Sequence, residues 1–73
     1  ILFMKLSARN QLSGTVTAIH EGAVNDEVLI ELPGGTVIAS IITKSAVETL
    51  GLKVGSSATA VVKATDVMVG IDD

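Results

Sequence analysis

The sequence predicts an all-β fold, a small and strongly curved barrel that carries one short helix. Hydrophobic and polar residues alternate along most of the 73 residues, and turn-forming residues interrupt the alternation about every ten residues. The pattern changes to helical spacing only once, after Thr43. Several short strands with a single helix before the last pair are typical of oligonucleotide/oligosaccharide-binding (OB)-like barrels.

Six segments show the alternation expected of strands. They are residues 4–12, 15–19, 27–32, 36–42, 56–64 and 67–71. We expect a bulge at Gly14, so that the first two segments form one long strand, and a loop over residues 20–26. Pro33-Gly34-Gly35 suits a type II turn, because proline sets φ at the second position and glycine accepts a positive φ at the third. Residues 27–42 are therefore predicted to form a hairpin.

The one predicted helix covers residues 43–51 and has about two turns. Hydrophobic residues recur in it at helical spacing, and Gly51 stands where a left-handed residue would end it. Two starts compete. Ser45 and Glu48 fit a capping box, whereas Thr43 is an alternative N-cap.

Composition favours a subunit interface as the source of stability. A chain of 73 residues buries a modest core, and the absence of cysteine excludes disulfides and thiolate zinc sites. A single histidine excludes a histidine-rich metal site. Because 48% of the residues are nevertheless hydrophobic, the apolar surplus predicts a homo-oligomer.

Other function classes are disfavoured. The net charge of −3, scattered basic residues and the lack of Trp and Tyr argue against nucleic-acid binding. No apolar run is long enough to cross a membrane, so we expect a cytoplasmic protein. We predict no enzyme, because His20 has no nucleophile or spaced partner and no glycine-rich phosphate loop precedes the helix.

A few residues suit a small tetrahedral oxyanion. Such a ligand requires converging hydrogen-bond donors and positive charge to offset its desolvation. Ser7 and Arg9 are two residues apart on one predicted strand and so share a face, while Thr43 and Lys63 supply a hydroxyl and an ammonium group. The alternative is that Arg9 and Lys63 are ordinary outward charges on strands and Thr43 is only a cap. The residues alone do not decide between the two.

Four blocks of sequence, taken together, resemble the molbindin (Mop) family of small molybdate- and tungstate-binding proteins. They are "SARNQLSGTVTAI", "GAVNDEV", "ITKSAVETLGL" and "VVKATDVMVGI". Residues 4–73 are accordingly interpreted as a single Mop domain, and residues 1–3 as an extension before it. The same unit resembles the repeats of molybdate-responsive regulators and of molybdate-transporter ATPase subunits. A single unit favours storage or buffering of the oxyanion.

The resemblance implies OB-like barrels that exchange strands to form dimers, and three dimers that form a hexamer. It also implies molybdate or tungstate as a ligand at subunit interfaces, with no catalytic cofactor and no metal ion outside the oxyanion. The implied ligands are Ser7 and Arg9 of one subunit with Thr43, Lys63 and the Ala64 backbone N–H of a neighbour. Further donors are implied from the backbone around Ala8 and from Lys44 and Ser45 to Ala46 at the helix start. A second class of site is placed near His20, Glu21, Gly22, Ala23, Val24 and Asn25.

A shell of donors suits molybdate, which carries no proton at neutral pH. Hydrogen phosphate carries one, and an unpaired buried polar group costs about 1–3 kcal/mol. Three alternatives to storage stay open: a regulatory Mop module that senses molybdate for a partner, an OB-type nucleic-acid-binding module, and a purely structural oligomerisation module.

Overall fold

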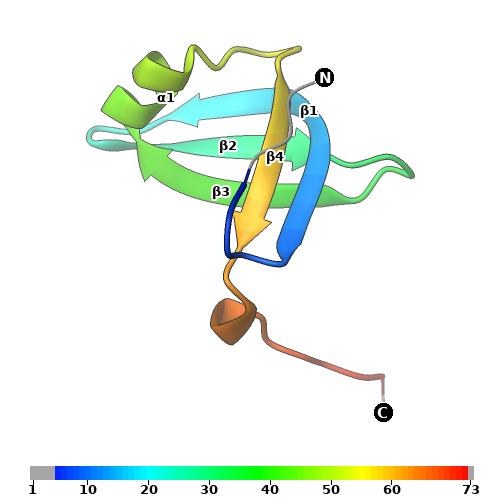
Figure 1. The fold of residues 1–73 in the computed structure, drawn as a ribbon. Coiled ribbons are helices and arrows are strands. Elements are labelled where there is room, and N and C mark those ends of the chain that lie inside the picture. Colours follow the sequence, from blue (N-terminus) through cyan, green and yellow to red (C-terminus); the bar gives the residue numbers. More distant parts are fainter. Residues whose placement is uncertain (1–4, 73) are drawn as a thin grey trace.

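A computed structural model describes residues 5–72 (Figure 1). Its elements are β1 (Asn10–Glu21), β2 (Asn25–Glu31), β3 (Val37–Thr43), α1 (Lys44–Leu50), β4 (Ser57–Val62) and the short 3-10 helix η1 (Ala64–Asp66). The strands form one antiparallel sheet in the order β3-β2-β1-β4. Figure 1 shows this sheet curled, with β4 running across β2 and β3. The predicted all-β, OB-like fold with one short helix is confirmed. The interpretation of residues 1–3 as an extension lies outside the described residues.

β1 is the strand on which the curl depends. Its first half pairs with β4 and its second half with β2, and Thr15 lies opposite both Ser57 and Glu31. The predicted bulge at Gly14 is wrong, because the register shifts between Val16 and Ala18 instead. Gly14 has another role. A Cβ atom there would overlap the Glu31 carbonyl oxygen, so glycine allows β1 to pass close to β2 where it changes partner.

The hairpin of β2 and β3 is confirmed. Its turn has the predicted type II features: Gly34 has a φ of 97°, and the Gly35 N–H donates to the Leu32 carbonyl at 3.0 Å. The ladder runs from the Glu31–Val37 pair to the Asn25–Thr43 pair. The end of β3 therefore lies beside the start of β2.

The helix begins and ends with local hydrogen bonds. Thr43 is the N-cap, and its Oγ1 accepts from the Ala46 N–H at 3.1 Å. The alternative capping box of Ser45 and Glu48 is wrong, because Ser45 is already the second residue of α1. Gly51 ends the helix in the left-handed conformation, with a φ of 65°, as predicted.

The predicted last strand, residues 67–71, does not form within the chain. After η1 the backbone runs away from the sheet (Figure 1). We call residues 67–72 the tail. Its large apolar side chains are exposed: Val67 is 50% exposed, Met68 95%, Val69 89% and Ile71 89%. A strand requires a neighbour for its backbone hydrogen bonds, and the described part of the chain offers the tail none.

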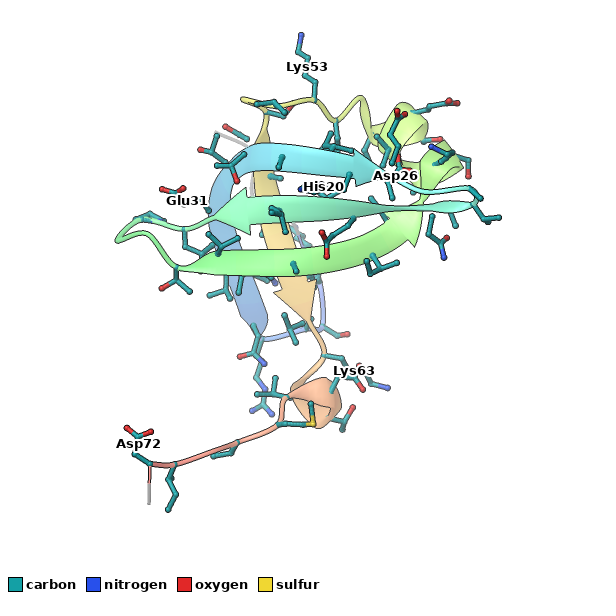
Figure 2. The ribbon with its side chains drawn as sticks, turned by 180° about the vertical axis from the view of Figure 1, so that it is seen from behind. His20, Asp26, Glu31, Lys53, Lys63 and Asp72 are labelled. Atoms are coloured by element: carbon teal, nitrogen blue, oxygen red, sulfur yellow. The ribbon has the colours of Figure 1, made fainter. Side chains whose placement is uncertain are left out.

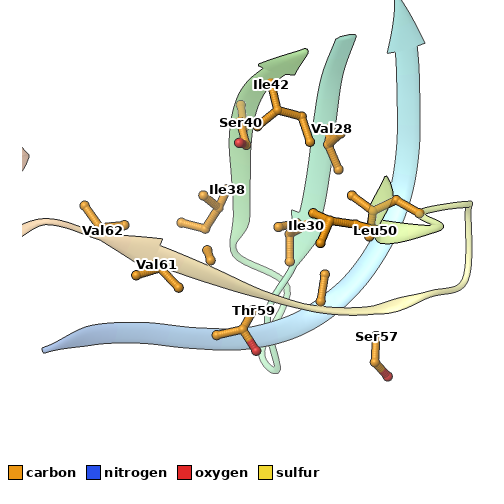
Figure 3. Close-up of a pocket in the computed structure, with 14 residues that line it drawn as sticks. Val28, Ile30, Ile38, Ser40, Ile42, Leu50, Ser57, Thr59, Val61 and Val62 are labelled. Atoms are coloured by element: carbon orange, nitrogen blue, oxygen red, sulfur yellow. The ribbon is translucent and has the colours of Figure 1, made fainter. Parts of the chain in front are cut away.

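The core is small, and one side of the sheet is open. Only Val16, Val28, Ile30 and Ala60 are buried apolar residues among residues 5–72. β3 and β4 are the two edges of the sheet and do not pair. Between them lies an apolar cleft of about 500 Å³ (Figure 3), which we call the seam. Its sides include Ile38 and Ile42 of β3 and Val61 and Val62 of β4, with Leu50 of α1 beside them.

Replacement of Gly14 tests the close approach of β1 and β2. We expect Gly14→Ala to lower the free energy of unfolding by about 1–3 kcal/mol, because the added methyl group meets backbone that cannot move freely. Urea unfolding measures this value. Thr15→Ser, which removes one methyl group from an exposed neighbour, is the control and should change it far less. Equal stabilities for the wild type and Gly14→Ala would contradict the account.

Candidate oxyanion-binding site

The segment that contains Ser7, Ala8 and Arg9 is irregular rather than a strand. β1 begins at Asn10, opposite Val62, the last residue of β4. Residues 5–9 have no ladder partner among the described residues, so the prediction that strand alternation puts Ser7 and Arg9 on one face is wrong. The Gln11 side-chain amide instead donates to the Ala8 carbonyl at 2.8 Å and fixes the bend that leads into β1.

Arg9 and Lys63 lie at the same end of the sheet. Each is the next residue beyond the terminal Asn10–Val62 pair of the β1–β4 ladder. Both are exposed, and within residues 5–72 neither forms an ion pair with a carboxylate. Figure 2 shows Lys63 where β4 leads into η1, below the curled sheet. Ala64 follows as the first residue of η1. Arg9 and Lys63, which have no carboxylate partner within residues 5–72, therefore lie at this end together with the Ser7 hydroxyl.

Thr43, Lys44 and Ser45 belong to the opposite end. Thr43 pairs with Asn25, beside the turn that connects β1 to β2, whereas Arg9 precedes the start of β1. The 12 residues of β1 separate the two groups, and Figure 1 shows α1 and η1 at opposite ends of the molecule. One small oxyanion cannot contact both groups of a single chain.

The strand-to-helix junction exposes two hydroxyl groups. The Thr43 and Ser45 hydroxyl oxygens are 3.2 Å apart, and both residues are exposed. The Ala46 N–H is already bonded to Thr43 Oγ1. Within residues 5–72 the Ser45 N–H has no hydrogen-bond acceptor. The junction thus presents hydroxyl and N–H donors to the outside of the chain.

Lys44 is different, because its N–H and its ammonium group are both engaged within its own chain. Its N–H donates to the Val24 carbonyl at 3.1 Å. Its ammonium nitrogen lies 3.0 Å from Asp26 Oδ1 and 3.6 Å from Glu21 Oε1. The hydrogen bond that the ammonium group donates to Asp26 is the main reason that the pKa of Lys44 is raised above its ordinary value. Lys44 therefore neutralises two carboxylates of its own chain.

The residues of the second predicted site class surround a tight turn. His20 and Glu21 end β1 and Asn25 begins β2, so only Gly22–Val24 form a loop and the predicted loop 20–26 is wrong. All six residues from His20 to Asn25 are exposed. The Gly22 N–H donates to Asp26 Oδ1 at 3.3 Å. Among residues 5–72 no three His, Asp or Glu side chains converge as a metal site.

The residue that sequence reasoning missed is Asp26. It is 3% exposed and is the only buried charged residue among residues 5–72. Asp26 was assigned to a loop, although it shares the inward face of β2 with Val28 and Ile30. That alternation, Asp26-Val28-Ile30, is the signal that could have identified it.

Comparison with known proteins establishes the family. The family model of the TOBE domain matches residues 6–69. The "probable molybdenum-pterin-binding protein" of Haemophilus influenzae is 51% identical over 69 residues, which cover 94% of this chain and 100% of the relative. The chain is a TOBE-domain protein of the Mop family.

Solved Mop structures share this fold. MopII from Clostridium pasteurianum is 51% identical, with a TM-score of 0.87 over 92% of this chain and 100% of MopII. The cytoplasmic molybdate-binding protein ModG, solved with molybdate bound, is 56% identical, with a TM-score of 0.91 over 94% of this chain and 49% of ModG. The "molybdenum transport protein ModE" of Herbaspirillum seropedicae is 48% identical over 90% of this chain but only 24% of ModE. The Mop unit therefore occurs both alone and within longer chains. No helix among residues 5–72 is long and apolar enough to span a membrane.

The ion pair of Lys44 makes a pH-dependent contribution to stability. Because the pKa of Lys44 is raised in the folded protein, this contribution is fully present below the unfolded lysine pKa of about 10.4. It is lost as the pH rises through the higher folded pKa. We expect the stability difference between the wild type and Lys44→Met, measured by urea unfolding, to shrink at strongly alkaline pH.

Lys53→Met is the control for this prediction, because Lys53 is exposed and forms no ion pair within residues 5–72. Its stability difference from the wild type should stay small throughout. A Lys44→Met difference that does not change between neutral and strongly alkaline pH would contradict the assigned pair.

Proposed function

We propose that this Mop-family chain binds molybdate and tungstate between its subunits and stores or buffers these oxyanions in the cytoplasm. The observation that carries the proposal is the division of the candidate donors. Arg9 and Lys63 lie at one end of the chain, and the Thr43 and Ser45 hydroxyls lie at the other. A complete shell then requires groups from different chains. The similarity to ModG, which was solved with molybdate bound, supports the choice of ligand.

The chemistry of these groups suits a fully deprotonated tetrahedral anion. Guanidinium, ammonium and backbone N–H groups only donate hydrogen bonds. Arg9 and Lys63 also bring the positive charge that offsets desolvation of a dianion. Hydrogen phosphate pays about 1–3 kcal/mol wherever its proton faces one of these donors, and only a hydroxyl oxygen of the shell can accept that proton. Sulfate carries the same charge as molybdate, so the fit of the larger ion to the shell discriminates between them.

Strand exchange supplies the assembly. In this proposal the tail of one subunit enters the seam of another and adds a strand between β3 and β4. The tail is apolar, exposed and already extended, and the seam is an apolar cleft between two unpaired sheet edges. Lys63 lies a few residues before the tail, so a docked tail carries Lys63 and Ala64 to the neighbouring subunit. Three such dimers form the hexamer.

We assign the chain a binding role rather than a catalytic one. A general acid or base needs a perturbed titratable group at a ligand site. The close pair that the structure contains, Asp26 and Lys44, is part of the framework of the chain. His20, the one histidine, is exposed at the end of β1.

The ModE similarity favours one second candidate, a Mop module that senses the oxyanion for a partner protein. In ModE the matching segment is about a quarter of a longer chain. A pull-down from cell extract with and without molybdate separates the two functions. Storage requires no partner, whereas sensing requires a partner whose capture depends on the anion.

Arg9→Ala tests the proposed ligand shell. We expect molybdate affinity to fall about tenfold or more, because a hydrogen bond to a charged group contributes about 1.5–3 kcal/mol. Isothermal titration calorimetry of the assembled protein with molybdate, sulfate and phosphate measures the effect. Lys53→Ala removes an equal charge from an exposed turn and should leave the affinity unchanged. Wild-type protein that ignores molybdate, or an Arg9→Ala variant with wild-type affinity, would overturn the assignment.

Val69→Asp tests the exchanged tail. The Val69 side chain is 89% exposed in the single chain, so the aspartate disturbs nothing unless the tail is buried in another subunit. We expect the oligomer to dissociate, because an unpaired charge in an apolar seam is strongly unfavourable. Sedimentation velocity measures the mass. Thr36→Asp adds the same charge in the exposed hairpin turn and should leave it unchanged. An intact Val69→Asp oligomer would refute the exchange.

A further inference from the structure

We infer that Asp26 and Lys44 are positioning residues for the oxyanion shell, and that Lys44 is not one of its ligands. Asp26 holds Lys44, and through it the strand-to-helix junction whose Thr43 and Ser45 hydroxyls face the anion. The inference rests on the proposed function and deepens it. The family resemblance implies Lys44 as a ligand. The inference instead gives Lys44 a structural role within its own chain.

The first support is the way in which Asp26 connects two segments. Its Oδ1 accepts from the Gly22 N–H at 3.3 Å and from the Lys44 ammonium group at 3.0 Å. The carboxylate therefore bonds both the β1–β2 turn and the first residue of α1. Because Asp26 is 3% exposed, its carboxylate has little access to water and depends on these two donors for its hydrogen bonds.

The second support is that Lys44 is held at both ends. Its N–H donates to the Val24 carbonyl at 3.1 Å, and its ammonium group donates to Asp26. It lies between Thr43 and Ser45 in the sequence. Fixing Lys44 therefore fixes the backbone that carries both hydroxyl groups, together with the unpaired Ser45 N–H.

The third support is electrostatic. A buried carboxylate close to an anion site repels the anion, and a lysine beside it would ordinarily be available to attract the anion. Here the lysine is bonded to Asp26 and lies near Glu21 as well. The positive charge of Lys44 is therefore not available to attract the anion, whereas the negative charge of Asp26 remains at this end of the chain. A role of the Asp26–Lys44 pair in positioning the Thr43 and Ser45 donors accounts for this arrangement.

Asp26→Asn separates positioning from simple charge, because the two roles predict opposite signs. If Asp26 acts only as a charge, removing it releases Lys44 and strengthens molybdate binding. If Asp26 positions the junction, the neutral amide holds Lys44 and Gly22 less firmly and binding weakens. We expect about tenfold weaker binding, because hydrogen bonds to charged groups are the ones lost.

The experiment is calorimetric titration of the assembled, full-length protein with sodium molybdate. Glu48→Gln is the matched control. It also removes one carboxylate close to the strand-to-helix junction, but Glu48 is exposed and forms no ion pair within residues 5–72, so we expect a change within about twofold. Lys44→Met should weaken binding as Asp26→Asn does. Lys44→Arg keeps a cation that can bond Asp26 and should restore most of the affinity.

A second readout distinguishes positioning from a general loss of stability. In the wild type, saturating molybdate should shift the amide resonance of Ser45 in ¹⁵N-correlated NMR spectra. In folded Asp26→Asn or Lys44→Met, the shift at saturation should be smaller, whereas a merely destabilised protein would show the full shift once saturated. Lys44→Arg should recover it.

Several outcomes overturn the inference. Equal or tighter binding by Asp26→Asn would assign Asp26 a charge role only, and full affinity in Lys44→Met would remove Lys44 altogether. Failure of Lys44→Arg to restore binding would also contradict it. A wild-type protein that shows neither heat nor a Ser45 shift with molybdate would overturn the proposed function itself, and this inference with it.

Discussion

The unpaired edges of β3 and β4 are the constraint on which the rest of this structure depends. A four-stranded sheet that curls without closing leaves two rows of backbone groups without partners and an apolar seam between them. Four buried apolar residues within residues 5–72 are a small core. The apolar residues that would complete the barrel are in the tail, outside it. The single chain thus leaves apolar surface uncovered, and in the proposed assembly other copies supply both the missing strand and the missing buried area.

The open sheet also determines where the proposed ligand groups lie. Arg9 and Lys63 are fixed at one end of the sheet by the β1–β4 ladder, and Thr43 and Ser45 at the other end by the β2–β3 ladder and the N-cap. In the proposed site the two ends of different chains together supply the donors. Because a docked tail would carry Lys63 onto a neighbour, closure of the barrel and assembly of the binding shell become one event. Stability and ligand binding are then linked, since a ligand that binds only the assembled state stabilises that state.

The elements that follow from local chemistry could be predicted from the sequence, and those that require a partner could not. The Pro33-Gly34-Gly35 turn and the Gly51 helix end are fixed by backbone preference, and both were predicted. Arg9 and Lys63 are candidates because of their chemistry, but their place at the same end of the sheet comes from the β1–β4 register, which no local pattern contains. Residues 67–71 alternate like a strand and have no ladder partner among residues 5–72. Asp26 was missed because an Asn-Asp pair is also a turn signal, and its burial depends on a lysine 18 residues away.

The most direct test of the central claim, that each oxyanion site is shared between chains, is subunit complementation. Arg9→Ala and Thr43→Ala subunits are unfolded, mixed in equal amounts and refolded together, and high-affinity molybdate sites are counted by equilibrium dialysis. If Arg9 and Thr43 of different chains form one site, the mixture regains part of the sites that each variant lacks alone, because some interfaces combine the two intact ends. If each site belongs to one chain, every subunit carries a defect and the mixture recovers none. That second result would contradict the account.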